Sequence, residues 1–496
     1  TMIRTAASRG VGQYTKVVVA AKPTKAKVQA RAYSGDTAHR DQYFVDYPQT
    51  YKDAHKKIVI VGGGTGGLAL ANRLAEQYEW INMTIVEPSR EHFYQPGWTL
   101  AGAGEINRNF TKKWTKSYIP SHANWINDRV IEFDPENNRI KTAEGEWVNY
   151  DVLAVSMGIE CKWDKIKGLT EAIGVDNVTS NYSYETCGYT WDLIQNFKGG
   201  NALFTQPATP IKCGGAPQKI MFMAEDHWEN RSDESNVRRN ANIEFLTGTP
   251  TQFVAPAYAE ILAKECEEKD IKVNLKHDLV EIRSETNEAV FKAGDNVVVK
   301  QYDFLHVTPP QGPPAIVSKS PLADEAGWMD VDKTTLQSTK YPNVFGLGDC
   351  TNIPTSKTAA AVSAQYPVVA NNIMSYVTGA EKTTWDAYDG FTGCPIPTGA
   401  SNLLMATFKY GAELYPDSDM KPSWYQYLVK KYAFPFLYWN FLLKGTWEGP
   451  HRWRSKQLAS WRKHWKSTVV APKVEFEKKD AKLQKKIEDF QTYTEH

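Results

Sequence analysis

The sequence predicts an α/β fold with two Rossmann-like dinucleotide-binding domains, the first of them discontinuous, followed by a C-terminal amphipathic region. Three observations predict this fold. A short strand, a glycine-rich turn and a helix follow one another over residues 57–75. Two runs of strand composition, at 201–204 and 241–246, indicate a second domain of the same kind. A strand at 341–346 leads into Gly348 and Asp349 and would complete the first domain from far along the chain.

Length and composition limit the classes of protein that need to be considered. The 496 residues are enough for two or three domains, and 42% hydrophobic with 23% charged residues is globular. A net charge of +1 gives no overall attraction to nucleic acid, so we exclude that class. The six cysteines are scattered without a C-x-x-C pair, which argues against a zinc site, against any other metal centre and against a disulfide framework. We expect a reducing compartment in which selected thiols do redox work.

Residues 1–33 are predicted to be a mitochondrial transit peptide and not part of the fold. The stretch is basic and rich in small residues, and no acidic residue precedes Asp36. Residues 31–34 are similar to a matrix-protease site, with cleavage expected after Tyr33. The alternative is a disordered basic tail. The basic residues are Arg4, Arg9, Lys16, Lys22, Lys25, Lys27 and Arg31.

The first domain opens with a dinucleotide-binding fingerprint. Gly62, Gly64 and Gly67 follow the strand 58–61 with G-x-G-x-x-G spacing, and residues 68–75 continue as a helix. The first glycine permits the tight turn, the second lets the backbone approach a pyrophosphate, and the third lets helix and strand pack closely. The phosphates would lie against unpaired N–H groups at the helix N-terminus. The alternative is a glycine-rich turn that binds no nucleotide.

The stretch after the fingerprint supplies the expected ribose ligand. A second strand, 83–86, ends in Glu87, twenty residues past Gly67, where a carboxylate should bind a ribose hydroxyl. A polar, helix-like stretch is expected to run to Ile119, and an antiparallel meander should follow over residues 130–150. The buried strand at 151–158 is of the kind at which two-domain flavoproteins cross between domains.

The second domain is predicted to have lost its nicotinamide site. In a relative that uses NAD(P)H, the turn after Phe204 would carry a second glycine fingerprint. Here that turn contains Pro207, Pro210 and Pro217 together with Cys213. Proline has no N–H to offer a pyrophosphate, so this turn is poorly built to bind one. We predict a flavoprotein that does not oxidise NADH or NADPH.

The first domain should close near residue 375. In flavoproteins of this architecture, an aspartate placed like Asp349 meets the ribityl or phosphate end of FAD, and the helix that begins within 355–361 points at the isoalloxazine. The predicted boundaries are 55–156 with 335–375 for the FAD domain, 157–334 for the second domain, 376–470 for the C-terminal region and 471–496 for a charged tail.

The C-terminal region is predicted to dock on a membrane surface. Aromatic residues crowd among lysines and arginines from 424 to 466, and the longest apolar run, 433–443, has eleven residues. A membrane span needs roughly 20, so we expect helices that lie in the membrane plane, the first one interrupted by Pro435. A chain cut after residue 420 should keep FAD and lose turnover with long-tailed quinone. A subunit interface or an ordinary core is the alternative. The residues expected to face lipid are Trp424, Tyr425, Tyr427, Leu428, Lys430, Lys431, Tyr432, Phe434, Phe436, Leu437, Trp439, Phe441, Leu442, Lys444, Trp447, Arg452, Trp453, Arg454, Trp461, Arg462, Lys463, Trp465 and Lys466.

Five motifs together resemble those of the mitochondrial sulfide:quinone oxidoreductases, an FAD family of the two-dinucleotide-binding-domain superfamily. The similarity spans about residues 55–455. The motifs are His92-Phe-Tyr-Gln-Pro, Thr209-Pro-Ile-Lys-Cys-Gly-Gly-Ala-Pro-Gln-Lys, Gly348-Asp-Cys-Thr-Asn-Ile-Pro-Thr-Ser-Lys-Thr, Tyr388-Asp-Gly-Phe-Thr-Gly-Cys-Pro and Pro435-Phe-Leu-Tyr-Trp-Asn.

The resemblance implies the site residues and the partners. The two redox cysteines of the family match Cys213 and Cys394, while Cys187, Cys350, Cys161 and Cys266 are read as thiols outside the reaction. The implied partners are hydrogen sulfide, ubiquinone, a small sulfur acceptor such as glutathione or sulfite, and the mitochondrial inner membrane, to which the protein would attach peripherally. Homo-oligomerisation is left open. The residues implied to bind FAD are Gly62, Gly64, Gly66, Gly67, Glu87, Gln95, Val130, Asp349 and Lys357.

The implied mechanism is an attack of sulfide on a Cys213–Cys394 disulfide, which leaves a persulfide on one cysteine and a thiolate on the other. Lys212 and Lys219 would lower thiol pKa values, and Lys357 would stabilise the negative edge of reduced flavin, unless these lysines are solvated surface charges. Three alternatives stay open: a type II NADH:quinone dehydrogenase, a disulfide reductase with a close cysteine pair, and an FAD-binding scaffold without activity.

Overall fold

The computed structural model describes residues 56–78, 80–230, 237–415 and 418–450, all of them within one unit that spans Pro48–His496. The predicted transit peptide, the docking residues beyond 450 and the charged tail lie outside the described residues. Two five-stranded sheets organise the fold, and both are parallel throughout. The predicted α/β class is therefore confirmed.

The first sheet is assembled from two distant parts of the chain. Its central strands are almost fully buried runs of Val, Ile, Leu and Ala, the composition that a parallel strand covered on both faces requires. The edge strand β20 pairs with β9 although about 190 residues separate them. The strand order is β20-β9-β1-β2-β5, with bounds β1 Lys57–Val61, β2 Asn82–Val86, β5 Asn124–Ile126, β9 Val152–Val155 and β20 Val344–Gly346.

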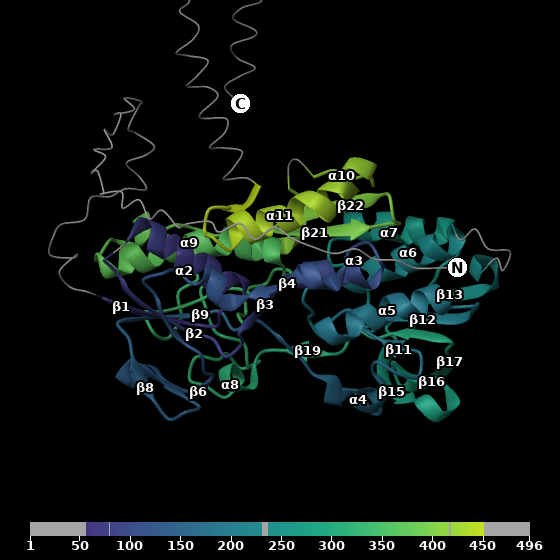
Figure 1. Cartoon of the computed structure of the whole chain (residues 1–496), viewed down its shortest axis with the longest axis horizontal. Helices are drawn as coiled ribbons and strands as arrows, with labels where there is room; N and C mark the ends of the chain where they lie inside the picture. Colours follow the sequence, from purple (N-terminus) through teal and green to yellow (C-terminus); the bar gives the residue numbers. More distant parts are fainter. Residues whose placement is uncertain (1–55, 79, 231–236, 416–417, 451–496) are drawn as a thin grey trace, which may run out of the picture. The chain divides into compact units, whose positions relative to one another are not determined.

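Helices α2 (Thr65–Gln77) and α9 (Ala359–Val377) pack against each other beside this sheet (Figure 1). The hydroxyl of Thr358 caps α9 by accepting a hydrogen bond from the N–H of Ala361 at 3.0 Å. The predicted meander forms as three antiparallel strands, β6 Val130–Asp134, β7 Arg139–Thr142 and β8 Trp147–Asn149.

The stretch before Ile119 is only partly helical, so that prediction is wrong for most of it. A short helix, α3 (Trp98–Gly102), is followed by a 3₁₀ turn, the strand β4 (Lys112–Trp114) and a second 3₁₀ turn. The strand β4 forms because β3 (Glu91–Phe93) pairs with it in antiparallel register. Tertiary pairing overrides the local helical preference of this polar stretch.

The second sheet has its strands in the order β11-β18-β12-β13-β14. Trp228 of α6 packs beside Phe204 and Phe304 in its core, and all three side chains are buried. Between β14 and β18 the chain forms a three-stranded antiparallel sheet, β15-β16-β17. The bounds are β11 Val178–Thr179, α5 Tyr184–Asn196, β12 Gly200–Gln206, α6 Ala216–Glu229, β13 Ala241–Thr247, α7 Pro256–Glu268, β14 Lys272–Leu275, β15 Asp278–Arg283, β16 Glu288–Ala293, β17 Asn296–Gln301 and β18 Phe304–His306.

The C-terminal part begins with a hairpin of β21 (Thr392–Pro397) and β22 (Leu403–Phe408). A helical segment then runs from α10 (Trp424–Leu428) to α11 (Phe434–Leu437) and on to Leu442. It lies along the side of the first sheet that α2 and α9 cover (Figure 1).

Pro435 does not interrupt this helical segment, so that prediction is wrong. The backbone turns just before and just after α11 are π-helical: the N–H of Phe434 bonds to the carbonyl of Val429, and that of Leu443 to the carbonyl of Tyr438. Proline has no N–H to donate within the helix, and the wider π-helical turns accommodate this missing hydrogen bond. The backbone therefore stays helical. Within the part of the chain that the structure describes, no helix is long and apolar enough to cross a membrane.

Candidate active site

A cavity of about 1620 Å³ brings together loops from both parallel sheets and the C-terminal helical segment. Most of the residues that the sequence points to as a site line it, and they come from segments as far apart as 62 and 357. Gly67, Val130 and Cys394 do not line it: Gly67 packs inward, Val130 begins β6 with its side chain buried, and Cys394 is buried between two lining residues of β21. The predicted residues that line the cavity are Gly62, Gly64, Gly66, Glu87, Gln95, Cys213, Asp349 and Lys357.

The glycine turn has the geometry that the fingerprint requires. Gly62 has φ +98°, and a Cβ there would lie 2.4 Å from the carbonyl oxygen of Ser156. A Cβ on Gly67 would lie 1.8 Å from the carbonyl oxygen of Gly62, so this glycine allows helix and strand to approach. Among the described residues, nothing lies within 4 Å of the corresponding position at Gly64, and no side chain caps α2. The backbone at Gly64 and the start of α2 are therefore open to an anion.

Glu87 holds the glycine turn as well as facing the cavity. Its carboxylate accepts hydrogen bonds from the N–H groups of Gly63 and Ser89, each at 2.6 Å. Burial raises the pKa of Glu87, and these two N–H donors oppose the rise. The carboxylate thus fixes the peptide at Gly63 in addition to any ribose that it binds.

Asp349 and Lys357 lie on the side of the cavity formed by the loop before α9. Burial raises the pKa of Asp349, and the ammonium of Lys357 opposes this. The Lys357 Nζ donates to the carbonyl of Thr351 at 2.9 Å and lies 3.9 Å from the ring centroid of Trp328. Burial lowers the pKa of Lys357, so the structure holds this amine where its charge is costly.

Asn181 is a residue of this cavity that sequence reasoning missed. Its side chain is 8% exposed and lines the cavity, yet within the described ranges neither its amide nitrogen nor its amide oxygen has a hydrogen-bond partner. Buried polar atoms are rarely left unpaired, so these two point to a ligand. The sequence could have indicated Asn181 by its position just after β11, because ligands bind at the carboxyl ends of parallel strands.

These residues fit a dinucleotide of the FAD kind. The open backbone at Gly64 and the uncapped start of α2 suit a pyrophosphate, the carboxylates of Glu87 and Asp349 suit ribose or ribityl hydroxyls, and the amide of Asn181 is free to bind a polar edge.

The two cysteines matched by resemblance meet beside this cavity. The Sγ atoms of Cys213 and Cys394 are 3.1 Å apart, which exceeds the roughly 2.05 Å of a disulfide bond, so both are thiols here. Cys213 lies in the loop after β12 with φ +56°, and its N–H donates to the carbonyl of Lys357 at 2.8 Å. Cys394 lies on β21 and is 1% exposed. The fold thus unites two residues that are 181 positions apart in the sequence.

Cys394 and Lys219 together favour negative charge on the Cys213 sulfur. Lys219 lies on α6, is 4% exposed, and its Nζ is 2.9 Å from the Sγ of Cys213. The S–H of Cys394, and then Lys219, hold the pKa of Cys213 well below its usual range, while the pKa of Cys394 is raised. Cys213 is therefore the thiolate of the pair. The Nζ of Lys212 instead lies over the rings of Trp98 and Tyr182.

Lys430 is a further residue of the site and not a lipid-facing one, so that part of the docking prediction is wrong. Its side chain is 2% exposed, and its Nζ donates to the carbonyl of Pro96 at 2.9 Å. Burial lowers the pKa of Lys430 to about 7, and the nearby charge of Lys219 adds to the effect. The π-helical turn in which Lys430 lies directs it inward. Tyr427, Trp439 and Leu442 are buried as well.

The remaining cysteines are ordinary thiols. Cys187, Cys266 and Cys350 are almost fully buried, and burial raises their pKa values to about 11, 12 and 11. Cys161 is partly exposed, and its pKa is also raised by burial. Raised pKa values suppress the thiolate form that redox exchange needs.

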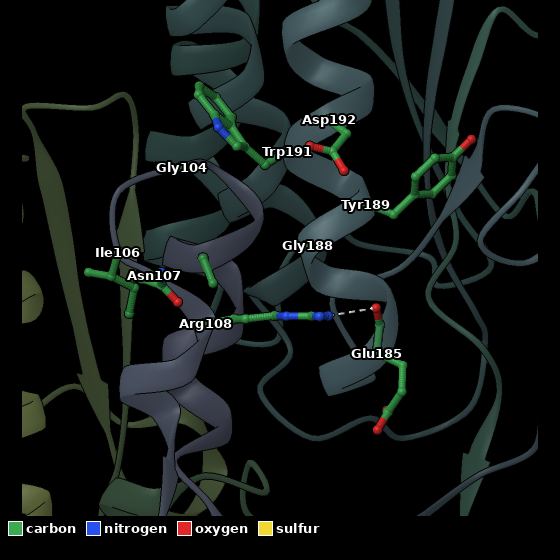
Figure 2. Close-up of a pocket in the computed structure, with 10 residues that line it drawn as sticks. Gly104, Ile106, Asn107, Arg108, Glu185, Gly188, Tyr189, Trp191 and Asp192 are labelled. Atoms are coloured by element: carbon green, nitrogen blue, oxygen red, sulfur yellow. Dashed lines mark hydrogen bonds between the residues drawn. The ribbon is translucent and has the colours of Figure 1, made fainter.

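A second, open pocket of about 650 Å³ lies between α3 and α5 (Figure 2). The side chain of Arg108 spans it, and its guanidinium donates to the backbone carbonyls of Tyr184 and Glu185 at 3.2 and 3.1 Å. None of the predicted site residues lines this pocket. The chemistry therefore belongs to the larger cavity.

Comparisons with known proteins identify the family. The chain is 45% identical over 403 residues to the mitochondrial sulfide:quinone oxidoreductase of Mus musculus, covering 80% of this chain and 88% of that protein. It is 44% identical over 399 residues to the Dictyostelium discoideum protein of the same name, covering 79% and 87%. The sulfide:quinone oxidoreductase structure from Aquifex aeolicus shares the fold, with a TM-score of 0.67 at 18% identity over 82% of this chain and 96% of that one. No protein-family model matches. On this evidence the chain belongs to the mitochondrial sulfide:quinone oxidoreductases, which are FAD-dependent enzymes that oxidise sulfide.

Proposed function

We propose that this enzyme oxidises hydrogen sulfide at Cys213 and Cys394, delivers two electrons by way of FAD to ubiquinone, and hands the sulfane sulfur to a small acceptor such as glutathione or sulfite. The observation that carries the proposal is the thiol pair at 3.1 Å, with the Lys219 ammonium against one sulfur, beside a cavity that fits FAD.

The first step starts from a disulfide between the two cysteines. The sulfur of HS⁻ attacks one cysteine sulfur, a new S–S bond forms, and the Cys213–Cys394 bond breaks. One cysteine becomes a persulfide and the other leaves as a thiolate with the electron pair of the broken bond. The sulfide sulfur is oxidised to the sulfane level, and the disulfide is reduced.

Cys213 is the better leaving group, so the persulfide forms on Cys394. In thiol exchange the sulfur with the lower pKa leaves faster, and the Lys219 ammonium beside Cys213 stabilises the departing thiolate. Cys394 is buried, but the cavity reaches its two neighbours, Gly393 and Pro395. Mass spectrometry of the trapped persulfide checks this assignment, and a persulfide on Cys213 would reverse it.

The glycine turn, Glu87 and Asp349 would hold FAD, with Gln95 and the backbone near Val130 as further expected contacts. Bound FAD would supply two-electron chemistry, taking electrons from sulfur and giving them to quinone. The thiolate of Cys213 is held toward the cavity by its backbone bond to Lys357. The ammonium of Lys357 is available to stabilise negative charge that develops in the cavity.

The enzyme is proposed to work in the mitochondrion, attached peripherally to the inner membrane, where its quinone is dissolved. The helical segment after residue 423 presents exposed rings, and three of them, Tyr425, Phe436 and Phe441, also line the cavity. Aromatic side chains at headgroup level are typical of in-plane docking helices. The exposed residues are Trp424, Tyr425, Leu428, Tyr432, Phe436 and Phe441.

Anaerobic spectroscopy of the FAD-loaded protein tests the function. Added sulfide should bleach the flavin absorbance without NADH, and ubiquinone should then restore it. Glutathione or sulfite should permit repeated cycles, because either removes the sulfane sulfur. Rapid bleaching by NADH would favour the type II NADH dehydrogenase reading instead, and no bleaching by sulfide would leave a flavin-binding scaffold.

A further inference from the structure

A hydrogen-bonded relay joins the C-terminal helical segment to the glycine turn of the first domain. The Tyr438 hydroxyl lies 2.8 Å from the Thr65 Oγ1 and 2.7 Å from the His92 Nε2. On its other side the His92 Nδ1 lies 3.2 Å from the carbonyl oxygen of Gly63. Tyr438 and His92 are 3% and 5% exposed, so water does not compete for these bonds.

The direction of each bond in the relay follows from one end. The carbonyl of Gly63 can only accept, so the His92 Nδ1 carries the hydrogen. Burial lowers the pKa of His92 to about 4, so at neutral pH the ring is neutral and its Nε2 is an acceptor. Tyr438 therefore donates to His92 and, in turn, accepts from the Thr65 hydroxyl.

The relay holds the turn on both sides of Gly64. Thr65 is the first residue of α2, and Gly63 is fixed at its carbonyl by His92 and at its N–H by Glu87. Gly64, between them, is the residue left open to the cavity. A turn fixed in this way has less conformational freedom to lose when a pyrophosphate binds.

Other contacts hold the same segment on α2. The Asn72 side-chain amide donates to the carbonyl of Leu443 at 3.0 Å, and Arg73 forms a buried ion pair of 2.6 Å with Glu448. A Cβ on Gly445 would lie 2.5 Å from the backbone nitrogen of Arg73, so the two backbones pass in direct contact.

We infer that Tyr438 is a positioning residue of the FAD site, so that FAD and the C-terminal segment stabilise each other's binding to the first domain. This inference rests on the proposed FAD site. It adds Tyr438 to that site, and Tyr438 belongs to the same helical segment as the proposed membrane-docking residues. By linkage, whatever the segment contributes to FAD affinity, FAD contributes equally to holding the segment in place.

Titration of the apoprotein with FAD, followed by quenching of flavin fluorescence, tests the inference. Tyr438→Phe should weaken FAD binding roughly 10-fold, because the buried His92 Nε2 and the Thr65 hydroxyl lose their shared partner. Thr65→Val should weaken it as well, and Thr65→Ser, which keeps the hydroxyl, should not. Tyr432→Phe is the matched control, since Tyr432 lies on the same segment and is 64% exposed.

Two further readouts separate positioning from general stability. The rise in melting temperature on adding FAD should be smaller in Tyr438→Phe than in the wild-type protein, beyond any loss of stability of the apoprotein itself. Hydrogen exchange of the backbone amides of residues 438–443 should slow on adding FAD in the wild-type protein and respond less in the variant.

Unchanged FAD affinity in Tyr438→Phe would overturn the inference, as would a loss of apoprotein stability with no change in affinity. If Tyr438→Phe does not fold, equal affinities of Thr65→Val and Thr65→Ser would overturn it. Failure of the wild-type protein to bind FAD would instead refute the proposed function.

Discussion

The ammonium nitrogen of Lys219 lies 2.9 Å from the sulfur of Cys213, and little solvent reaches the lysine. A charge pair in such surroundings interacts much more strongly than one at the surface. The contact makes the two cysteines chemically unequal. The Cys213 sulfur lies against the Lys219 ammonium, and the S–H of Cys394 donates to the Cys213 sulfur. The first two predictions follow from this asymmetry.

Replacing Lys219 should make Cys213 a weaker acid. Lys219→Met removes the cation that stabilises the thiolate, so the Cys213 pKa rises and the midpoint of its alkylation by iodoacetamide moves to higher pH. Peptide mass spectrometry of the reduced apoprotein across a pH series measures it. Lys212→Met is the matched control and should leave the midpoint in place, because its ammonium lies over aromatic rings. Equal shifts in the two variants would contradict the assignment.

Cys213 and Cys394 should act as one unit. The variants Cys213→Ser, Cys394→Ser and the double variant should lose sulfide:quinone turnover to a similar extent, several orders of magnitude, because neither sulfur can form the disulfide alone. Cys350→Ser is the control and should keep most activity, since its buried thiol donates to the backbone carbonyls of Val155 and Leu347. Should Cys350→Ser be as inactive as Cys213→Ser while still folded, the cysteine assignment fails.

The backbone at residue 213 should prefer glycine. Its φ of +56° lies in the left-handed region, which glycine adopts freely and alanine does not. Cys213→Gly should therefore be more stable than Cys213→Ala by about 1 kcal/mol, although both lack the thiol. Chemical denaturation of the two FAD-loaded variants measures the difference. A more stable alanine variant would show that the loop does not hold this conformation in solution.

The exposed rings of the C-terminal segment should set membrane affinity. Trp424, Tyr432 and Phe436 are 65%, 64% and 59% exposed, and changing all three to serine should weaken binding to anionic phospholipid vesicles by roughly 10-fold for each ring that inserts. Turnover with long-tailed quinone should fall with it. Val297→Ser, at an exposed apolar position on β17, is the control. Unchanged vesicle binding in the triple variant would mean that another surface docks.

A chain cut after residue 420 is a poorer test than the sequence suggested. It would remove Tyr438 and Glu448, and with them the contacts that hold Thr65 and Arg73 of α2. Loss of FAD from such a fragment would therefore report damage to the first domain as much as loss of docking, which is why surface substitutions are preferable.

Local sequence was sufficient for much of the fold. Buried parallel strands such as β1 and β9 consist of apolar runs, and the glycine spacing after β1 reflects backbone requirements that few other residues satisfy. These signals are short-range, so they can be interpreted without knowing the neighbours. The same holds for the prolines that replace a second fingerprint after β12.

Long-range features were outside the reach of such signals. No spacing rule relates Cys213 to Cys394, and only the family resemblance paired them. Lys430 and Tyr438 sit among aromatic and basic residues whose pattern is the same whether they face lipid or protein. Their burial is decided by the loop at 92–96, which packs against them from another part of the chain. Pro435 was misread because the compensating π-helical turns have no simple sequence signature.

The scattered origin of the first sheet has a consequence for how the protein is made. Its strands come from residues 57–155 and again from 344–346, and the segment that packs onto α2 extends to Glu448. The second sheet uses only residues 178–306, all contiguous. During synthesis, the later-encoded sheet therefore has all its strands first, and the sheet begun by the earliest strand must wait for residues 344–346. The usual N-to-C order of domain folding is reversed in this chain.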